Sequence, residues 1–278
     1  KPKKNRKSVI NFSMEPLLLN MGKLNDISDV FGNFILSPLL YPFQGKVIHV
    51  SHQSISGKFH IRPWTMDKWI IKEVWGFNEY NGKFLKIGPS DIVVDIGAQI
   101  GVFTVFASKL APKGKVLAYE PHPENYRLLS QNTSLNTCLN VELFQTAVGK
   151  NNSKHTTRLF VNPRNSGGHS TVSAVGNSAI QVQQTSLSQI VQTHKIKRIN
   201  YLKIDTEGSE YNILLTAPAG IIDIIDKISL EYHDFLTKRN HHELVSFLKS
   251  HGFQFQVVSN PILRSGNIIA SKKTVKSN

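Results

Sequence analysis

Acidic residues and glycines between positions 91 and 120 have the types and spacing that bind an adenosine-containing cofactor. The apolar run DIVVD ends on Asp95, and a turn with Gly97, Ala98 and Gly101 follows it. The next apolar run, KVLAYE, ends on Glu120. Glycines let the backbone approach a ligand closely, and a carboxylate at the end of the second strand accepts hydrogen bonds from ribose hydroxyls. These five residues are therefore the first candidates for cofactor binding.

The form of the glycine turn distinguishes between two cofactors. A dinucleotide site has the pattern G-x-G-x-x-G, in which the second glycine admits a pyrophosphate at the helix N-terminus. Here the pattern is D-x-G-A-x-x-G, and Asp95 would repel a pyrophosphate. A carboxylate suits a cofactor that carries an amino group and a sulfonium. The turn therefore favours S-adenosylmethionine over NAD.

Two later apolar runs also lead into residues that could do chemistry. Asp205 and Glu207 follow the run YLKI, whereas Glu231 and His233 end the run ISLEYH. The carboxyl ends of parallel strands share one edge of a sheet, and ligands bind there at the point where strand order reverses. We therefore expect these side chains at the site, and a capping or loop-tying role is the alternative for each.

The chemistry of the cofactor suggests roles for three of these residues. A sulfonium methyl is already activated, so the protein has to align the acceptor and remove its proton. His233 is the first candidate for the base, because its unperturbed pKa of about 6.5 suits proton transfer near neutrality. Glu207 is the second candidate for the base or for orienting the acceptor. We expect Asp205 to face the methionine part of the cofactor.

The turn after YLKI narrows the class of acceptor. Enzymes that methylate exocyclic amino groups place an Asn/Asp-Pro-Pro-aromatic turn here, and its carbonyls accept hydrogen bonds from the amino group. In this chain the turn is DTEG at 205–208, without proline. The sequence therefore favours an oxygen acceptor.

The clustered carboxylates leave a metal cofactor open. Asp205, Glu207 and Glu231 could converge on Mg²⁺, which takes oxygen ligands. The eleven histidines form no H-E-x-x-H motif, and the single cysteine, Cys138, cannot build a zinc site. We therefore assign no metal ligand and keep Mg²⁺ as a second cofactor to be tested.

The elements that must position these residues alternate between strands and helices. This order predicts an α/β fold with a doubly wound, mostly parallel sheet of seven strands, covered on both faces and closed by an antiparallel strand. The expected strands are 92–96, 115–119, 141–145, 201–204, 227–232, 253–258 and 267–272, and the expected helices include 101–110, 123–135, 209–216 and 241–252.

The flanks of this alternation predict two further features. Residues 1–80 are expected to be an N-terminal extension with a basic tail, a β-hairpin turning at Ser56-Gly57 and a helix at 65–77, while 81–278 form the cofactor-binding domain. Residues 150–180 are polar and rich in Gly and Ser, so we expect a mobile loop that covers the acceptor. His169 in this loop either reaches the acceptor or is a plain surface histidine.

Several stretches carry a resemblance that goes beyond single residues. They are VVDIGAQIGVFT (93–104), YEPHPENYRLL (119–129), QTAVG (145–149), YLKIDTEGSE (201–210) and ISLEYH (228–233), after the lead-in 59–75. In this order they resemble the FkbM family of S-adenosylmethionine-dependent methyltransferases. The resemblance implies a Rossmann-like methyltransferase fold and O-methylation of a hydroxyl on a sugar, a glycan or another small molecule such as a polyketide.

We expect the adenine of the cofactor to lie between two segments of this domain. Pro121 and His122, directly after the ribose carboxylate, would supply one face. Thr146 and Ala147 lie in the opposite turn, and Ala147 is small enough to let the edge of the ring approach the backbone.

The formal net charge of +14 is concentrated at the two ends of the chain. Residues 1–7 carry five positive charges and residues 261–278 carry four, and neither segment contains an acid. Basic tails suit nucleic acid or an anionic surface, so an RNA-modifying methyltransferase acting on ribose 2′-hydroxyls is the alternative to a small-molecule or glycan enzyme. The third hypothesis is a non-catalytic cofactor-binding protein, which predicts a lost glycine turn or ribose acid; neither loss is seen.

No apolar run approaches the roughly 20 residues that a membrane span needs. No signal peptide is recognisable, and we expect a cytoplasmic protein. The chain begins at Lys1 rather than at a methionine, so a trimmed leader is compatible with the sequence.

Overall fold

The computed structural model describes residues 46–272, apart from 78–79, 81–84, 153, 163–164, 174–177 and 261. The chain divides into two compact units, 1–44 and 45–278, and all described residues belong to the second unit. The predicted basic segment 1–7 and the last two lysines of the C-terminal segment lie outside the described residues. Within the described part of the chain, no helix is long and apolar enough to cross a bilayer.

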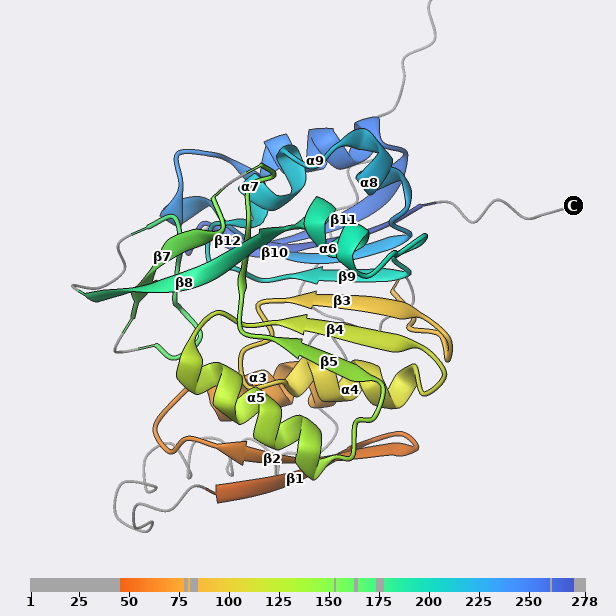
Figure 1. Ribbon diagram of the computed structural model, residues 1–278, viewed down its shortest axis with the longest axis vertical. Helices are drawn as coiled ribbons and strands as arrows, with labels where there is room; N and C mark the ends of the chain where they lie inside the picture. The colour runs from red at the N-terminus through yellow and green to blue at the C-terminus, as the bar shows by residue number, and fades with distance from the viewer. Residues whose placement is uncertain are drawn as a thin grey trace, which may run out of the picture. The chain divides into compact units, whose positions relative to one another are not determined.

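A mostly parallel sheet forms the centre of the second unit (Figure 1). Its strands are β3 (Ile92–Ile96), β4 (Lys115–Tyr119), β5 (Val141–Phe144), β9 (Tyr201–Ile204), β10 (Lys227–His233), β11 (Phe253–Asn260) and β12 (Ser265–Lys272). The order is β11-β12-β10-β9-β3-β4-β5. The strands from β5 to β10 are parallel, whereas β12 is antiparallel to both β10 and β11. This arrangement confirms the predicted seven-stranded α/β fold and its antiparallel closing pair.

Strand order reverses between β3 and β9. The chain runs from β3 outward through β4 to β5 and then returns to β9 on the other side of β3. Ile96 of β3 is in register with Ile204 of β9, so the turns that follow the two strands lie side by side. A ligand site in an open α/β sheet is expected at this place.

Helices pack on both faces of the sheet because successive residues of its central strands, which point to opposite faces, are buried. The helices are α3 (Asp67–Ile71), α4 (Val102–Leu110), α5 (Pro123–Leu135), α6 (Leu187–Thr193), α7 (Glu210–Leu215), α8 (Ala219–Asp223) and α9 (His241–Ser250). Val94 and Ile96 belong to a core with the helices α6 to α9, whereas Val93 belongs to a second core with α3, α4 and α5. Figure 1 shows α3, α4 and α5 close to the hairpin β1–β2, and α7, α8 and α9 together at the opposite end of the view.

The N-terminal hairpin forms as predicted, but its turn lies elsewhere. Strands β1 (Lys46–His52) and β2 (Ile55–Ile61) turn at positions 53 and 54, not at 56 and 57. Gly57 lies inside β2, where a Cβ would come within 2.9 Å of the rings of Phe59 and Trp75. Gly57 is therefore required for packing against these rings, and the sequence analysis wrongly took it for a turn residue.

The hairpin is tied to α5 by two asparagines. The side chain of Asn132 accepts from the backbone N–H of His60 and donates to its carbonyl, at 2.7 and 3.2 Å. Asn136 makes the same pair of bonds with Lys58, at 2.9 and 2.6 Å. The hairpin thereby gains a helix as its neighbour on the side that has no further strand.

Two other expectations needed correction. The helix expected at 65–77 is α3 followed by a π-helical turn, η1 (Lys72–Gly76), and α3 begins after Met66 without a side-chain cap. The segment expected to be a loop at 150–180 contains β7 (Thr156–Val161) and the start of β8 (Ser178–Ser186), which pair with each other. With β6 (Ala147–Gly149) they form a second sheet of order β6-β8-β7. Leu159 is the one residue of β7 that is fully buried, so β7 does not need an alternating apolar pattern. Sequence reasoning therefore had no strand signal to detect there.

Candidate cofactor and acceptor site

A cavity of about 680 Å³ opens at the carboxyl edge of the sheet, where β3, β4, β9 and β10 end. Nine of the eleven residues predicted from the sequence line it, and two do not. The lining residues are Gly97, Ala98, Glu120, Pro121, Thr146, Ala147, Asp205, Glu207 and His233; the other two are Asp95 and Gly101.

The glycine turn after β3 is required by close contacts on its two sides. Gly97 has a φ of 79°, and a Cβ at this position would lie 1.7 Å from the carbonyl oxygen of Asp205. Gly101 has a φ of 87°, and its Cβ would lie 2.6 Å from Leu129 of α5. Gly97 therefore lets the turns after β3 and β9 touch, while Gly101 starts α4 against α5, behind the cavity wall.

Asp95 is buried behind the same turn. Its carboxylate accepts a hydrogen bond from the Thr104 hydroxyl at 2.6 Å and forms an ion pair with Lys203 Nζ at 3.3 Å. Lys203 also donates to the carbonyl of Gly97 at 2.9 Å, and it lines the cavity. Burial acts to lower the pKa of the Lys203 ammonium, but the carboxylates of Asp95 and Asp205 raise it above the usual value. Asp95 therefore acts on the turn through a lysine that remains charged.

Sequence reasoning did not single out Lys203. A lysine inside the apolar run YLKI was the available signal, because a fully buried lysine needs a paired carboxylate. Its partner depends on β9 lying next to β3, with Lys203 in register with Asp95. That pairing follows from strand order and not from local sequence.

Glu120 directly follows β4, and its carboxylate is held by two backbone donors. The N–H of Gln99 donates to one oxygen at 2.9 Å, and the N–H of His122 donates to the other at 2.8 Å. Burial raises the pKa of Glu120 to about 7, although these hydrogen bonds oppose that change. The carboxylate is thus fixed between the turn after β3 and the start of α5, at one end of the cavity.

His169 lies beside this end of the cavity and is not a plain surface residue. Its ring stacks on that of His122 with centroids 4.1 Å apart, and its Nδ1 accepts from the backbone N–H of Asn162 at 3.1 Å. Burial lowers the pKa of His169 to about 4, so the ring is neutral at physiological pH. The neighbouring Ser170 donates to the carbonyl of Glu207 at 2.6 Å, which anchors the segment expected to cover the site.

His233 lines the other end of the cavity together with Glu207 and Glu231, and a third glutamate, Glu210, is buried beside its ring. His233 Nδ1 lies 3.2 Å from Glu210, and Nε2 lies 3.5 Å from Glu207 and 3.6 Å from Glu231. Glu210 also accepts from the backbone N–H groups of His233 and Gly208, both at 2.8 Å. Glu210 was not among the predicted residues, although it ends the run KIDTEGSE on which the family resemblance partly rests.

These carboxylates change the charge state that the sequence suggested for His233. Burial acts to lower its pKa, but Glu210, Glu207 and Glu231 together raise it to about 10. The ring is therefore an imidazolium at neutral pH and has no free lone pair to accept a proton. Burial raises the pKa of Glu207 to about 7 and that of Glu231 to about 8, so these carboxylates titrate near neutrality instead.

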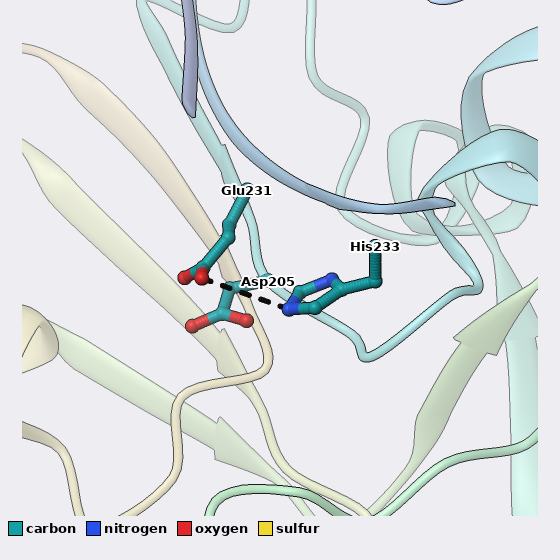
Figure 2. Close-up of side chains that lie close together, drawn as sticks. All are labelled: Asp205, Glu231 and His233. Carbon is teal, nitrogen blue, oxygen red and sulfur yellow. Dashed lines mark ion pairs between the residues drawn. The ribbon is translucent and has the colours of Figure 1, made fainter. Parts of the chain in front are cut away.

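Asp205, Glu231 and His233 also form a candidate metal group. Figure 2 shows the three side chains converging, and one ligand atom from each lies within 4.8 Å of the others. Mg²⁺ takes oxygen ligands in a near-octahedral arrangement. One of the three donors here is an imidazole, and it is already paired with carboxylates, so this donor set fits Mg²⁺ poorly. Mg²⁺ as a second cofactor is not supported.

Comparisons with known proteins agree with this geometry. A family model described as a methyltransferase FkbM domain matches residues 95–255, more than half of the 278-residue chain. The chain is 26% identical over 191 residues to "Methyltransferase 1" of Beauveria bassiana (strain ARSEF 2860), covering 61% of this chain and 75% of the relative. It is 24% identical over 240 residues to 31-O-demethyl-FK506 methyltransferase FkbM of Streptomyces tacrolimicus, covering 74% and 90%.

A third relative is the hexuronic acid methyltransferase AglP of Haloferax volcanii, which is 22% identical over 186 residues, with 64% of this chain and 74% of the relative covered. The matched residues 95–255 include the glycine turn, Glu120 and the whole cluster around His233. The chain belongs to the FkbM family and is an S-adenosylmethionine-dependent methyltransferase.

Proposed function

We propose that the protein transfers the methyl group of S-adenosylmethionine to a hydroxyl oxygen of a small molecule or glycan. The observation that carries this proposal is the pair of half-buried carboxylates beside His233, Glu207 and Glu231, whose pKa values of about 7 and 8 suit a base working near neutrality. An oxygen nucleophile needs such a base, because its proton must leave during attack. The names of two relatives, a 31-O-demethyl-FK506 and a hexuronic acid methyltransferase, are consistent with oxygen acceptors.

The cofactor would lie across the strand ends, with its adenosine at Glu120. The Glu120 carboxylate would accept hydrogen bonds from the ribose hydroxyls, and Pro121, Thr146 and Ala147 would flank the adenine. Glu120 directly follows β4 and His233 ends β10, three strands away in the sheet order. At about 4.8 Å per strand this separation is roughly 14 Å, which leaves the reacting end of the cofactor near the acidic cluster.

The methionine part would lie on the turn after β3. Gly97 and Ala98 supply backbone without bulk, and Asp205 offers a carboxylate to the amino group of the cofactor. Lys203 holds the carbonyl of Gly97 and keeps the turn in place. Asp95 supports this turn from behind, through Lys203, and Gly101 supports it through α4.

The acceptor would react beside Glu207. When bound, S-adenosylmethionine supplies an activated methyl group; Glu207 takes the hydroxyl proton as the oxygen attacks. His233 then does not act as the base, which is the role that its unperturbed pKa suggested. As an imidazolium between Glu207, Glu210 and Glu231 it holds the base in position. Glu207 adopts a φ of 51°, which turns it into the cavity directly after β9.

A transfer assay tests this function. The full chain would be incubated with S-adenosylmethionine labelled in the methyl group and with carbohydrate, lipid and RNA fractions, each with and without EDTA. We expect label in alkali-stable O-methyl ethers, no requirement for a divalent ion, and loss of incorporation in Glu207→Gln. Label in N-methyl groups or in RNA, or incorporation that EDTA abolishes, would contradict the respective part of the proposal.

A further inference from the structure

Exposed apolar side chains surround the mouth of the cavity. Met66, Trp69, Phe235, Ile262 and Leu263 all line the cavity, yet they are 47%, 44%, 51%, 91% and 60% exposed. They come from three separate parts of the chain: the start of α3, the 3-10 helix η3 (Asp234–Leu236) and the turn between β11 and β12. We call these five residues the apolar rim.

Two parts of the apolar rim lie close to His233. The Phe235 ring meets the His233 ring edge-on with centroids 5.9 Å apart. Ser265, the first residue of β12, is in register with His233, so Leu263 lies only two residues from that pairing. Phe235 and the turn before β12 thus lie beside the acidic cluster, and the start of α3 contributes the rest of the rim.

The rim side chains are not explained by packing within the described residues. Trp69 satisfies its indole N–H with Glu73, and its ring meets Phe77 edge-on at 6.4 Å, so the ring sits on the surface with its polar atom already bonded. Exposed apolar side chains that gather around one cavity often mark a binding surface. Here that surface continues into a cavity whose inner end is acidic.

We propose that the apolar rim binds the hydrophobic part of the acceptor, which is therefore an amphiphile. This inference rests on the proposed function and adds the substrate class. A hydroxyl-bearing polar head would enter as far as Glu207 and Glu231, and a hydrocarbon chain or ring system attached to it would lie against Phe235, Ile262 and Leu263. The carboxylates of Glu207 and Glu231 within the cavity and the exposed apolar side chains around it match a molecule that enters head first.

A binding experiment tests this with defined probes. The full chain, saturated with S-adenosylhomocysteine, would be titrated by calorimetry with dodecyl maltoside below its micelle concentration, and with maltose as the head-group control. We expect binding of the dodecyl compound and much weaker binding of maltose. The double variant Ile262→Gln/Leu263→Gln should bind dodecyl maltoside about tenfold or more weakly, because each apolar side chain covered by the ligand contributes on the order of 1 kcal/mol or more.

The matched control is Leu139→Gln. Leu139 is 92% exposed and does not line the cavity, so the same kind of change there should leave dodecyl maltoside affinity unaltered. Both variants replace exposed residues and should bind S-adenosylhomocysteine as the parent does. Equal dodecyl maltoside affinity in the rim and control variants, or maltose binding as tight as dodecyl maltoside, would overturn the proposal.

Two further measurements separate the remaining explanations. Co-sedimentation with phosphatidylcholine vesicles that contain a galactolipid shows whether the amphiphile is taken from a bilayer; binding to vesicles or to the monomeric probe supports the proposal. Sedimentation velocity tests whether the apolar rim is covered by a second copy of this chain. A dimer that dissociates in the Ile262→Gln/Leu263→Gln variant would overturn the amphiphile proposal. If the parent chain did not bind S-adenosylhomocysteine at all, that result would refute the proposed function. The comparison of dodecyl maltoside affinity between the rim and control variants would still test the amphiphile proposal.

Discussion

At the scale of single residues, the charge of His233 decides which group can act as a base. Three carboxylates raise its pKa to about 10, whereas the pKa of Glu207 is about 7, and our proposal therefore assigns the role of proton acceptor to Glu207. The sequence located the correct strand ends but assigned the ring an unperturbed pKa. Partners from β9, α7 and β10 create the difference, and their convergence requires the folded sheet.

Activity should follow the ionisation of Glu207. The carboxylate accepts a proton only when ionised, so kcat/KM is expected to rise with pH through about 7 and to level off above it. Glu207→Gln should lower turnover by about 10²–10⁴-fold and abolish this rise. The measurement is a pH–rate profile for both forms with S-adenosylhomocysteine affinity as the control. An unchanged rise in the variant would assign the ionisation to another group.

Folding stability should report the protonation of His233. Its pKa of about 10 in the folded state lies above the unfolded value of about 6.5, so its stabilising contribution is complete below pH 6.5 and is lost as the pH rises to 10. One pKa unit is worth about 1.36 kcal/mol, so the loss is on the order of a few kcal/mol. Urea unfolding at pH 6, 8 and 10 should show it in the parent but not in His233→Gln. If the free energy of unfolding changed with pH in the same way in the parent and in His233→Gln, the His233 ring would not gain a proton on folding.

Cofactor affinity should depend on Glu120. Charge-assisted hydrogen bonds to the ribose are each worth about 1.5–3 kcal/mol, so Glu120→Gln should weaken S-adenosylhomocysteine binding by about tenfold or more. Glu124 is a nearby exposed carboxylate on α5, and Glu124→Gln should leave the affinity almost unchanged. Calorimetry that ranks the two variants equally would remove the ribose assignment.

At the scale of elements, local sequence predicts best where burial is continuous. Strands 92–96, 115–119 and 201–204 and the helix 123–135 were predicted with the bounds that the structure has, because each is an apolar or periodic run with clear ends. The hairpin turn was misplaced because Gly57 serves the packing of Trp75. The support of the glycine turn by Lys203 was missed because it spans neighbouring strands that lie far apart in the sequence.

Two glycines offer a matched test of the turn between β3 and β9. Gly97→Ala places a Cβ 1.7 Å from the Asp205 carbonyl at a φ of 79°, so the turns must separate. We expect a loss of stability of about 1–3 kcal/mol or more and weaker cofactor binding. Gly220→Ala in α8 meets nothing within 4 Å and should be neutral or stabilising by up to about 1 kcal/mol. Urea unfolding and calorimetry on both variants decide this, and equal effects would show that the contact tolerates a methyl group.

At the scale of the whole molecule, the net charge of +14 bears on the choice of acceptor. A protein that makes 6–10 phosphate contacts loses about 10³–10⁵ in affinity between 50 and 200 mM salt. For an amphiphilic or glycan acceptor we expect the KM to change by less than about threefold over that range. Measuring the KM at both salt concentrations distinguishes this from an RNA acceptor, for which a steep increase is expected.

The strand order also has a consequence for synthesis of the chain on the ribosome. The central strand β3 is complete at Ile96, but its neighbour β9 begins only at Tyr201. At about 5–20 residues per second, one edge of β3 waits roughly 5–20 s for its partner. Until then β3, β4 and β5 can pair only among themselves, and the open edge of an apolar strand is a site for wrong pairing. The edge of β3 that later pairs with β9 beside the cavity is thus the part of the nascent chain most in need of protection.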